Sequence, residues 1–252
     1  YYVILSLTLF QQLVTKDNPS LRWDYFFFLQ NYNPPLDIFY VSWSLAVEEH
    51  FYLFIAPVLA LIAPIPRSWK MLFFMILIFL PSVFRFFELY DEKFETHVRI
   101  DGCVFGVFAA YLYVDFNRFW QLLEKYSGIL FAISVLAFLM FFVQRWFPMD
   151  WISDPSILAL AFVFVIWVIF ANSSDGRKNG FYFPGAYYIA TRSYSLYLLH
   201  PEAIALINRV PVEFNFFVYL SLVLILSLFL SEFLYRFVEL NFMNLRSKFS
   251  FS

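Results

Sequence analysis

The sequence predicts an all-α protein, a polytopic transmembrane helical bundle with about eight membrane-spanning helices in a single domain at 1–252. Of the 252 residues, 62% are hydrophobic and 14% are charged, whereas a soluble domain carries roughly 25% charged residues. The mean hydropathy is +0.69, and the apolar residues gather in long runs. So much apolar surface requires lipid around it.

Eight apolar runs approach the length of a spanning helix, which needs roughly 20 residues. Helices are expected because lipid offers an open backbone no hydrogen-bond partners, and the runs lack the alternation of barrel strands. The first run is already apolar at Tyr1, so we expect a fragment whose upstream helices are missing. The predicted helices are 1–14, 43–63, 71–89, 98–114, 127–143, 156–171, 187–207 and 216–237.

Small residues line one face of the predicted helix at 98–114. Gly102 and Gly106 are followed by Ala109 and Ala110. Such faces let helices pack closely in membranes. We therefore expect another helix to pack against this face.

The connecting segments differ in positive charge. The loops at 64–70, 115–126 and 172–186 and the tail at 238–252 carry eight Lys and Arg residues. The loops at 15–42, 90–97, 144–155 and 208–215 carry five. Because cytoplasmic loops are enriched in Lys and Arg, we expect the first set, with the C-terminus, to be cytoplasmic. The longest loop, 15–42, is expected to form an ordered cap on the other side.

Ionisable side chains inside membrane segments are costly and usually functional. From the helix rise of about 1.5 Å per residue, five of them are expected in the outer half of the bilayer. We expect them to line a polar cavity. They are Glu48, Arg85, Arg99, Asp101 and His200.

Each candidate also has a structural alternative. Glu48 and Glu49 point about 100° apart on a helix, and a salt bridge is as reasonable for them as a site role. The fork of Arg99 suits a carboxylate or an oxyanion, or a plain ion pair with Glu48 or Asp101. His97 shares a helix face with Asp101, although its place at a helix end favours a solvated imidazole.

Another polar group precedes a proline in the segment 187–207. Pro201 removes the hydrogen bond to the carbonyl of Tyr197 and is expected to kink the helix beside His200. Ser193 and Ser195 extend this polar wall, or their hydroxyls satisfy the local backbone.

Composition excludes some classes of function. The net charge of −2 does not suggest a nucleic-acid partner, and three His with one Cys are too few for a metal cluster. These residues alone do not distinguish an enzyme from a transporter.

Four segments carry a resemblance to acyltransferase family 3. Residues 42–53 read SWSLAVEEHFYL and are similar to its WSLxxEExFYL signature. Residues 96–102 read THVRIDG and, with Gly106 and Ala109, resemble its hxRxDxxxxGxxxA element. Residues 193–200 read SYSLYLLH, like its SYSLYLxH element, and 235–239 read YRFVE, like its closing YRxxE pattern. All four follow the family's order.

The resemblance implies an integral membrane O-acyltransferase. Family members transfer acyl groups, often acetyl, to hydroxyls of carbohydrates such as cell-surface polysaccharides. The implied donor is an acyl-CoA, acetyl-CoA above all, on the cytoplasmic side, and no metal is implied. The implied location is the bacterial inner membrane. The chain would lack the family's first two helices, with their proposed catalytic His and basic segment.

Residue by residue, the resemblance and the charge pattern together give a candidate site. The expected catalytic residues are Glu48, Arg99, Asp101 and His200. The expected substrate-binding residues are Trp43, Ser44, Tyr52, Arg85, His97, Ser195 and Tyr197.

Two charged residues near the other face have two interpretations. Arg192 and Arg236 either help to hold the donor's phosphates or form an ion pair with Glu232, and the ion pair is favoured. The alternative function is a transporter or exporter of a sugar or lipid-linked sugar, which would use the same cavity without covalent chemistry. A third interpretation is a non-catalytic membrane scaffold.

Overall fold

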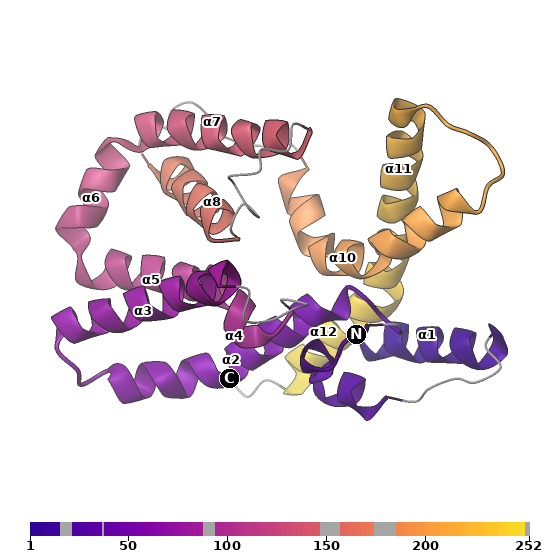
Figure 1. Ribbon diagram of the computed structural model, residues 1–252, viewed down its shortest axis with the longest axis horizontal. Coiled ribbons are helices and arrows are strands. Elements are labelled where there is room, and N and C mark those ends of the chain that lie inside the picture. Colours follow the sequence, from indigo (N-terminus) through magenta and orange to yellow (C-terminus); the bar gives the residue numbers. More distant parts are fainter. Residues whose placement is uncertain (16–21, 37, 88–93, 147–156, 174–184, 250–252) are drawn as a thin grey trace. The chain divides into compact units, whose positions relative to one another are not determined.

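The computed structural model describes residues 1–15, 22–36, 38–87, 94–146, 157–173 and 185–249. These residues form helices and their connections, with no strand among them (Figure 1). The predicted all-α class is therefore confirmed. The chain divides into two compact units, of which the first comprises Tyr1–Leu21, Asp37–Val41 and Tyr182–Ser252 and the second Arg22–Leu36 and Ser42–Phe181.

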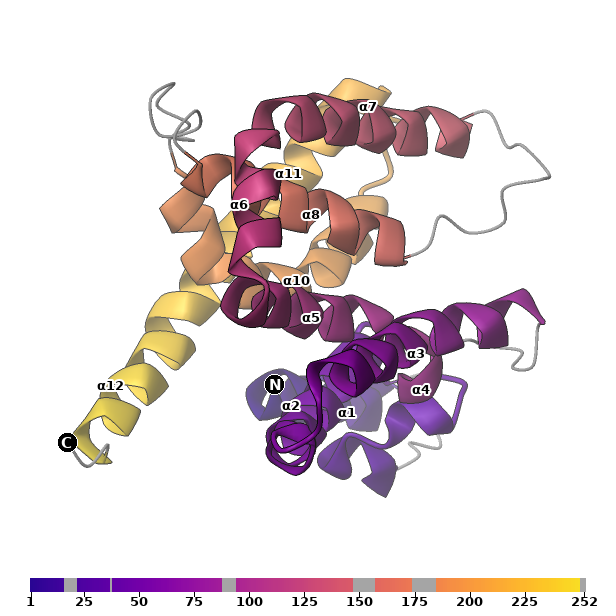
Figure 2. The same ribbon diagram turned by 90° about the vertical axis from the view of Figure 1, so that its left-hand side faces the viewer.

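The second unit is built from helices that follow one another closely along the chain. Helix α3 packs against α5, α5 against α8, and α7 against α8 (Figures 1 and 2). Buried apolar side chains of α2, α3 and α5, among them Phe51, Phe74 and Val104, form a core cluster. The elements are η1 (Trp23–Phe27), η2 (Gln30–Tyr32), α2 (Ser42–Ile62), α3 (Arg67–Phe86), α4 (Thr96–Arg99), α5 (Asp101–Asp115), α6 (Asn117–Lys125), α7 (Ser127–Trp146) and α8 (Ile157–Asn172).

The first unit centres on a pair of packed helices, α10 and α11. Asn215 caps the start of α11, because its side chain accepts a hydrogen bond from the backbone N–H of Val218 at 2.9 Å. A π-helical turn then carries the chain from α11 into α12. The elements are α1 (Tyr2–Thr15), α10 (Ala186–Asn208), α11 (Phe216–Leu234), η3 (Tyr235–Glu239) and α12 (Leu240–Phe249).

Every one of the eight predicted apolar segments contains a helix, namely α1, α2, α3, α5, α7, α8, α10 and α11. Within the described residues, three helical stretches are long and apolar enough to cross a membrane: Ser42–Ile62, Arg67–Phe86 and Phe216–Arg246. A fourth is added if α6 and the start of α7, bent by 72°, count as one span. Membrane helices are thus present, and eight spans remains a prediction.

Several connections contain more helix than the sequence led us to expect. The predicted loop at 115–126 contains α6, and the predicted tail at 238–252 contains α12. Apolar residues such as Phe119 and Leu122 recur in α6 at helical spacing, and the Trp120 indole donates to the Glu124 carboxylate at 3.0 Å, one turn away. Local periodicity and an i,i+4 pair therefore make this connection helical.

Two further expectations concern the loop at 15–42 and the small-residue face. Over residues 22–36 the loop forms η1 and η2, and η2 packs against α2. At Gly106, an added Cβ would meet no other atom within 4 Å. Close helix packing at Gly106 is therefore a wrong prediction, since the glycine faces open space.

Some sequence expectations fall on residues outside the described ranges. They concern parts of the loops at 15–42, 90–97, 144–155 and 172–186, and the end of the helix at 71–89.

Candidate functional site

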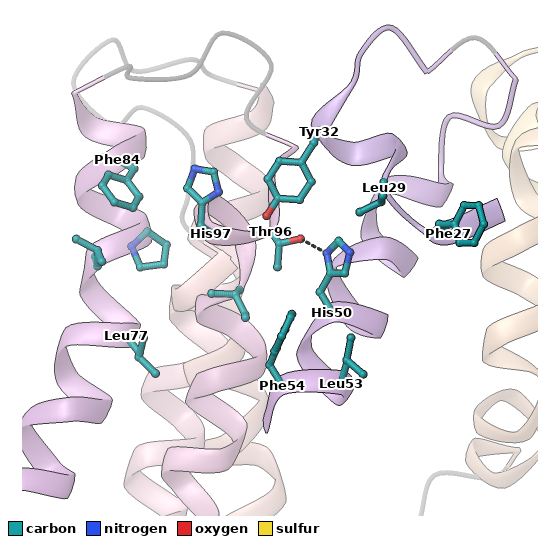
Figure 3. A pocket seen from close by; sticks show the side chains of 13 residues that line it. Phe27, Leu29, Tyr32, His50, Leu53, Phe54, Leu77, Phe84, Thr96 and His97 are labelled. Carbon is teal, nitrogen blue, oxygen red and sulfur yellow. Dashed lines mark hydrogen bonds between the residues drawn. The ribbon is translucent and has the colours of Figure 1, made fainter. Parts of the chain in front are cut away.

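The first two sequence motifs meet in the second unit. Helix α4 and the turn η2 both pack against α2. His50 of α2 places its Nδ1 2.6 Å from the hydroxyl oxygen of Thr96 of α4 (Figure 3). The guanidinium of Arg99 lies over the Trp43 ring, 5.7 Å from its centroid. Residues about fifty positions apart in the sequence are thus brought into contact.

An open pocket of about 600 Å³ lies beside this contact. Tyr32, Thr96, His97 and His50 lie together at one end, with Phe84 and Leu29 beside them (Figure 3). The apolar side chains of Leu53, Phe54 and Leu77 lie further along the helices. The arrangement suits a ligand with an apolar part and a polar group at one end. The lining residues are Phe27, Leu29, Tyr32, His50, Leu53, Phe54, Leu77, Leu80, Pro81, Phe84, Thr96, His97 and Ile100.

Buried amides hold the polar end of the pocket in place. The Asn31 side chain, 1% exposed, donates from Nδ2 to the Thr96 hydroxyl at 2.9 Å and to the Phe94 carbonyl at 3.3 Å. Gln30 Nε2 donates to the Ser42 carbonyl at 3.0 Å. These bonds tie η2 to both α2 and α4, and so orient the hydroxyl that faces His50.

His97 lies between two aromatic rings. Its imidazole is stacked on Tyr32, with ring centroids 5.9 Å apart and planes at 18°, and it meets the edge of Phe84 at 5.7 Å and 77°. The expectation of a solvated imidazole is therefore wrong, because η2 and α3 cover a helix end that the sequence alone presents as open.

Next to the lining residues Phe84 and Ile100, Arg85 of α3 and Asp101 of α5 form a buried ion pair. Arg85 Nη2 lies 2.5 Å from Asp101 Oδ2, and Nη1 lies 3.4 Å from Oδ1. The same guanidinium donates to the Val98 carbonyl and, at 2.9 Å, to the Ser82 hydroxyl. Asp101 is 0% exposed, so the pair joins α3, α4 and α5 from the inside.

Among the remaining expected site residues of this unit, Glu48 and Tyr52 are exposed, and Trp43 and Ser44 are half-buried. Of all the expected residues, His97 is the one that lines the pocket. Sequence reasoning left Tyr32, His50 and Thr96 out of the site. His50 and Thr96 lie within the first two motifs, which was a signal for them, whereas Tyr32 lies in the loop at 15–42, outside both motifs.

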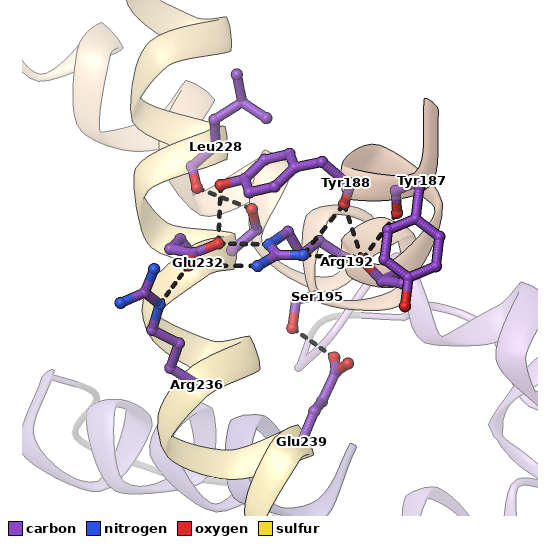
Figure 4. A network of polar contacts seen from close by, with 10 residues as sticks. Tyr187, Tyr188, Arg192, Ser195, Leu228, Glu232, Arg236 and Glu239 are labelled. Atoms are coloured by element: carbon purple, nitrogen blue, oxygen red, sulfur yellow. Dashed lines mark hydrogen bonds and ion pairs between the residues drawn. The ribbon is translucent and has the colours of Figure 1, made fainter. Parts of the chain in front are cut away.

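The third and fourth motifs meet in the first unit (Figure 4). The hydroxyl of Ser195, which is 0% exposed, donates to the carboxylate of Glu239. Arg192 lies between two rings, 3.9 Å from the centroid of Tyr188 and 4.3 Å from that of Tyr235. The motif residues of α10 and of the π-helical turn after α11 are thus joined.

Glu232 of α11 is the centre of this network. It forms ion pairs with Arg192 and Arg236 and accepts a hydrogen bond from the Tyr188 hydroxyl at 2.8 Å. The predicted ion pair with Glu232 is therefore confirmed for both arginines. The guanidinium of Arg192 is enclosed by two aromatic rings and pairs with the carboxylate of Glu232, so it joins α10 to α11.

His200 and Tyr197 lie further along α10, which continues through Pro201 as one helix. The Tyr197 hydroxyl donates to the Val41 carbonyl at 3.0 Å. His200 Nδ1 lies 2.8 Å from the carbonyl oxygen of Tyr197. His200 belongs to the first unit and Arg99 to the second, so a single cavity that contains both remains a prediction.

Within the described part of the chain, no group of three or more His, Cys, Asp or Glu side chains is placed to hold a metal ion.

An all-α protein with several membrane-length helices belongs to the class of helical membrane proteins. In this chain the four motifs also meet in pairs. Residues 2–236 match the acyltransferase domain model of acyltransferase family 3. The chain belongs to this family, and the resemblance seen in its motifs is confirmed.

Similar proteins are found in Staphylococcus aureus, in strains COL, MW2 and N315 among others. They carry the name "Putative O-acetyltransferase" and are 27% identical to this chain over 215 residues. The match covers 79% of this chain and 35% of each relative, so the chain spans about a third of their length. No solved structure matches the chain.

Proposed function

We propose that this protein is a membrane O-acyltransferase that moves an acyl group, expected to be acetyl, from acyl-CoA to a hydroxyl of a carbohydrate. The observation that carries the proposal is the family match over 2–236, together with the name of the relatives at 27% identity. The contact of His50 with Thr96 supports a built polar site between the first two motifs.

The proposed reaction needs a proton acceptor and a stabilised oxyanion. The acceptor hydroxyl forms an ester bond with the thioester carbon, the carbon–sulfur bond breaks, and the hydroxyl proton ends on the thiol of CoA. General bases and preorganised positive charge speed such transfers. We assign the positive charge to Arg99, with Glu48 near the acceptor hydroxyl, as the motifs imply.

Asp101 takes a different role from Arg99 in this proposal. Because Asp101 is fully buried and bound to Arg85, it acts as a positioning residue that holds α4 and therefore Arg99. Tyr32, His50, Thr96 and His97 add polar groups for the acceptor at the open pocket. Trp43, Ser44 and Tyr52 are assigned to the acceptor side as well.

In the first unit, His200, Ser195 and Tyr197 are assigned to the same reaction. In this proposal the protein lies in the bacterial inner membrane, with eight spans and a cytoplasmic C-terminus. Its donor, acyl-CoA, is available on the cytoplasmic side. The acceptor is a carbohydrate of the cell surface. No observation of the structure favours the alternative of a sugar exporter, and an assay of acetyl transfer separates the two functions.

The test measures transfer of radiolabelled acetyl from acetyl-CoA to polysaccharide by the whole protein in lipid nanodiscs. Arg99→Ala and Glu48→Gln are expected to abolish transfer while the amount of folded protein, measured by size-exclusion chromatography, stays the same. Exposed residues of the same types provide matched controls, Arg209→Ala and Glu213→Gln, which are expected to transfer normally.

Normal transfer by both site variants would contradict the site assignment. Movement of sugar across the bilayer of a proteoliposome, with no acylated product, would instead support the exporter.

A further inference from the structure

A proline in α10 leaves one backbone carbonyl without its helical donor. Pro201 has no N–H, so it cannot donate to the carbonyl of Tyr197 one turn earlier. The Nδ1 of His200 lies 2.8 Å from that carbonyl oxygen. The imidazole therefore takes the place of the missing backbone donor.

This contact decides which ring nitrogen of His200 carries the proton. A carbonyl oxygen can only accept a hydrogen bond, so Nδ1 must donate. A neutral imidazole has one N–H and one lone pair. With the proton on Nδ1, the lone pair is on Nε2.

The surroundings of the carbonyl keep it in position. Tyr197 is anchored through its hydroxyl to the Val41 carbonyl at 3.0 Å, and its ring lies 5.7 Å from the imidazole. Leu198 and Ala203, on either side of Pro201, are 1% and 0% exposed. The helix is therefore packed on both sides of the proline, and the carbonyl cannot easily turn away from the ring.

Two other prolines lie inside helices of the described residues, and neither has this arrangement. Pro57 of α2 follows Ala56, and Pro81 of α3 follows Leu80. The side chains of Ala56 and Leu80 have no hydrogen-bond donor. They therefore cannot bind the backbone carbonyl, four residues before the proline, that has lost its N–H partner. The pairing of an imidazole with a proline-freed carbonyl is thus specific to α10 among these three helices.

We propose that Pro201 is a positioning residue that holds His200 in the Nδ1–H tautomer, so that Nε2 is a hydrogen-bond acceptor for the hydroxyl of the substrate. The assignment of the hydroxyl as the partner of Nε2 rests on the proposed acyltransferase function. The tautomer itself does not depend on that function, because it follows from the backbone contact.

The first experiment measures the tautomer of His200 by ¹⁵N NMR of the whole protein, labelled at histidine and held in lipid nanodiscs. The His200 signals are assigned from their loss in His200→Asn. In the unchanged protein at a pH where imidazole is neutral, we expect a protonated Nδ1 and an unprotonated Nε2.

Pro201→Ala restores a backbone N–H for the Tyr197 carbonyl, and alanine favours the helix. This variant is expected to fold and to move His200 toward the Nε2–H tautomer. Pro57→Ala is the matched control and is expected to leave the His200 signals unchanged. A protonated Nε2 in the unchanged protein, or no shift in Pro201→Ala, would overturn the proposal.

The second experiment measures acetyl transfer. In His200→Asn the amide nitrogen can still donate to the Tyr197 carbonyl, but Nε2 is gone. Transfer is expected to fall by about 100-fold, with folded protein retained. Normal transfer by His200→Asn would overturn the role of Nε2. If the unchanged protein shows the expected tautomer but transfers no acetyl, the proposed acyltransferase function is contradicted and the tautomer is not.

Discussion

In the second unit, His50 and Tyr32 border an open pocket of about 600 Å³. In the first unit, Arg192 is enclosed by the rings of Tyr188 and Tyr235 and by the carboxylate of Glu232. Each unit brings two sequence motifs into contact. In the second unit polar side chains line an open pocket, whereas in the first unit charged side chains pair with one another. A contact between two motifs therefore does not by itself mark an open binding site.

The charges of the two units also differ in their burial. The carboxylate of Asp101 is 0% exposed beside Arg85 at 10%. The carboxylate of Glu232 is 21% exposed and is shared by two arginines. Removing one partner of an ion pair should therefore lower the free energy of unfolding most in the second unit, because solvent cannot take the place of the lost partner there.

The largest expected effect follows removal of one half of the buried pair. Asp101→Asn leaves the Arg85 guanidinium without its ionic partner, and breaking a buried pair in this way costs about 3–5 kcal/mol. The melting temperature in detergent, followed by tryptophan fluorescence, is expected to fall strongly, with loss of folded protein.

The matched control is Arg67→Ala, because Arg67 pairs with Asp115 at 3.6 Å but is 69% exposed. This change should cost less than about 1 kcal/mol. The apolar double variant Arg85→Met with Asp101→Leu should recover stability relative to Asp101→Asn. Equal losses of stability for Asp101→Asn and Arg67→Ala would show that burial does not explain how much each ion pair contributes.

An intermediate effect is expected in the network of the first unit. Arg192→Lys keeps the charge but loses the planar fork that contacts Glu232 and stacks on two rings. Its melting temperature should fall, although less than that of Asp101→Asn. Arg236→Lys is the matched control, since Arg236 binds the same carboxylate but is 67% exposed, and it should change little. A larger fall for the Arg236 variant would reverse the assignment of Arg192 as the residue that joins α10 to α11.

The smallest effect on stability is expected at the pocket. Thr96→Val removes the hydroxyl that meets His50 and Asn31 at 2.6 and 2.9 Å, at a cost of about 1 kcal/mol. Because the imidazole of His50 then loses the contact that orients it, the rate of acetyl transfer should fall clearly, although the free energy of unfolding changes little.

Thr8→Val provides the control for this change, because the Thr8 hydroxyl donates to its own helix at the Ile4 carbonyl. Its transfer rate should be unchanged. Unchanged transfer by Thr96→Val as well would remove the Thr96–His50 contact from the proposed site.

Sequence reasoning located the helices well and the contacts of the charges less well. The apolar runs predicted α2 and α11 because a run of such length has few other ways to satisfy its backbone in lipid. The ion pairs of Glu232 were also predictable, since Arg236 lies one turn away on the same helix. For Asp101, proximity in the sequence pointed to His97 or Arg99, whereas a buried partner, Arg85, is supplied by α3.

The sequence by itself determined the all-α class, the positions of the eight helical segments and, through four motifs in order, the family. These properties depend on the lengths of apolar runs and on residues close together in the chain. Only the tertiary structure decided that His97 lies between two rings, that His50 meets Thr96, and that Arg85 holds Asp101. Each of these contacts joins separate elements of the fold, so it depends on which faces pack together and not on local spacing.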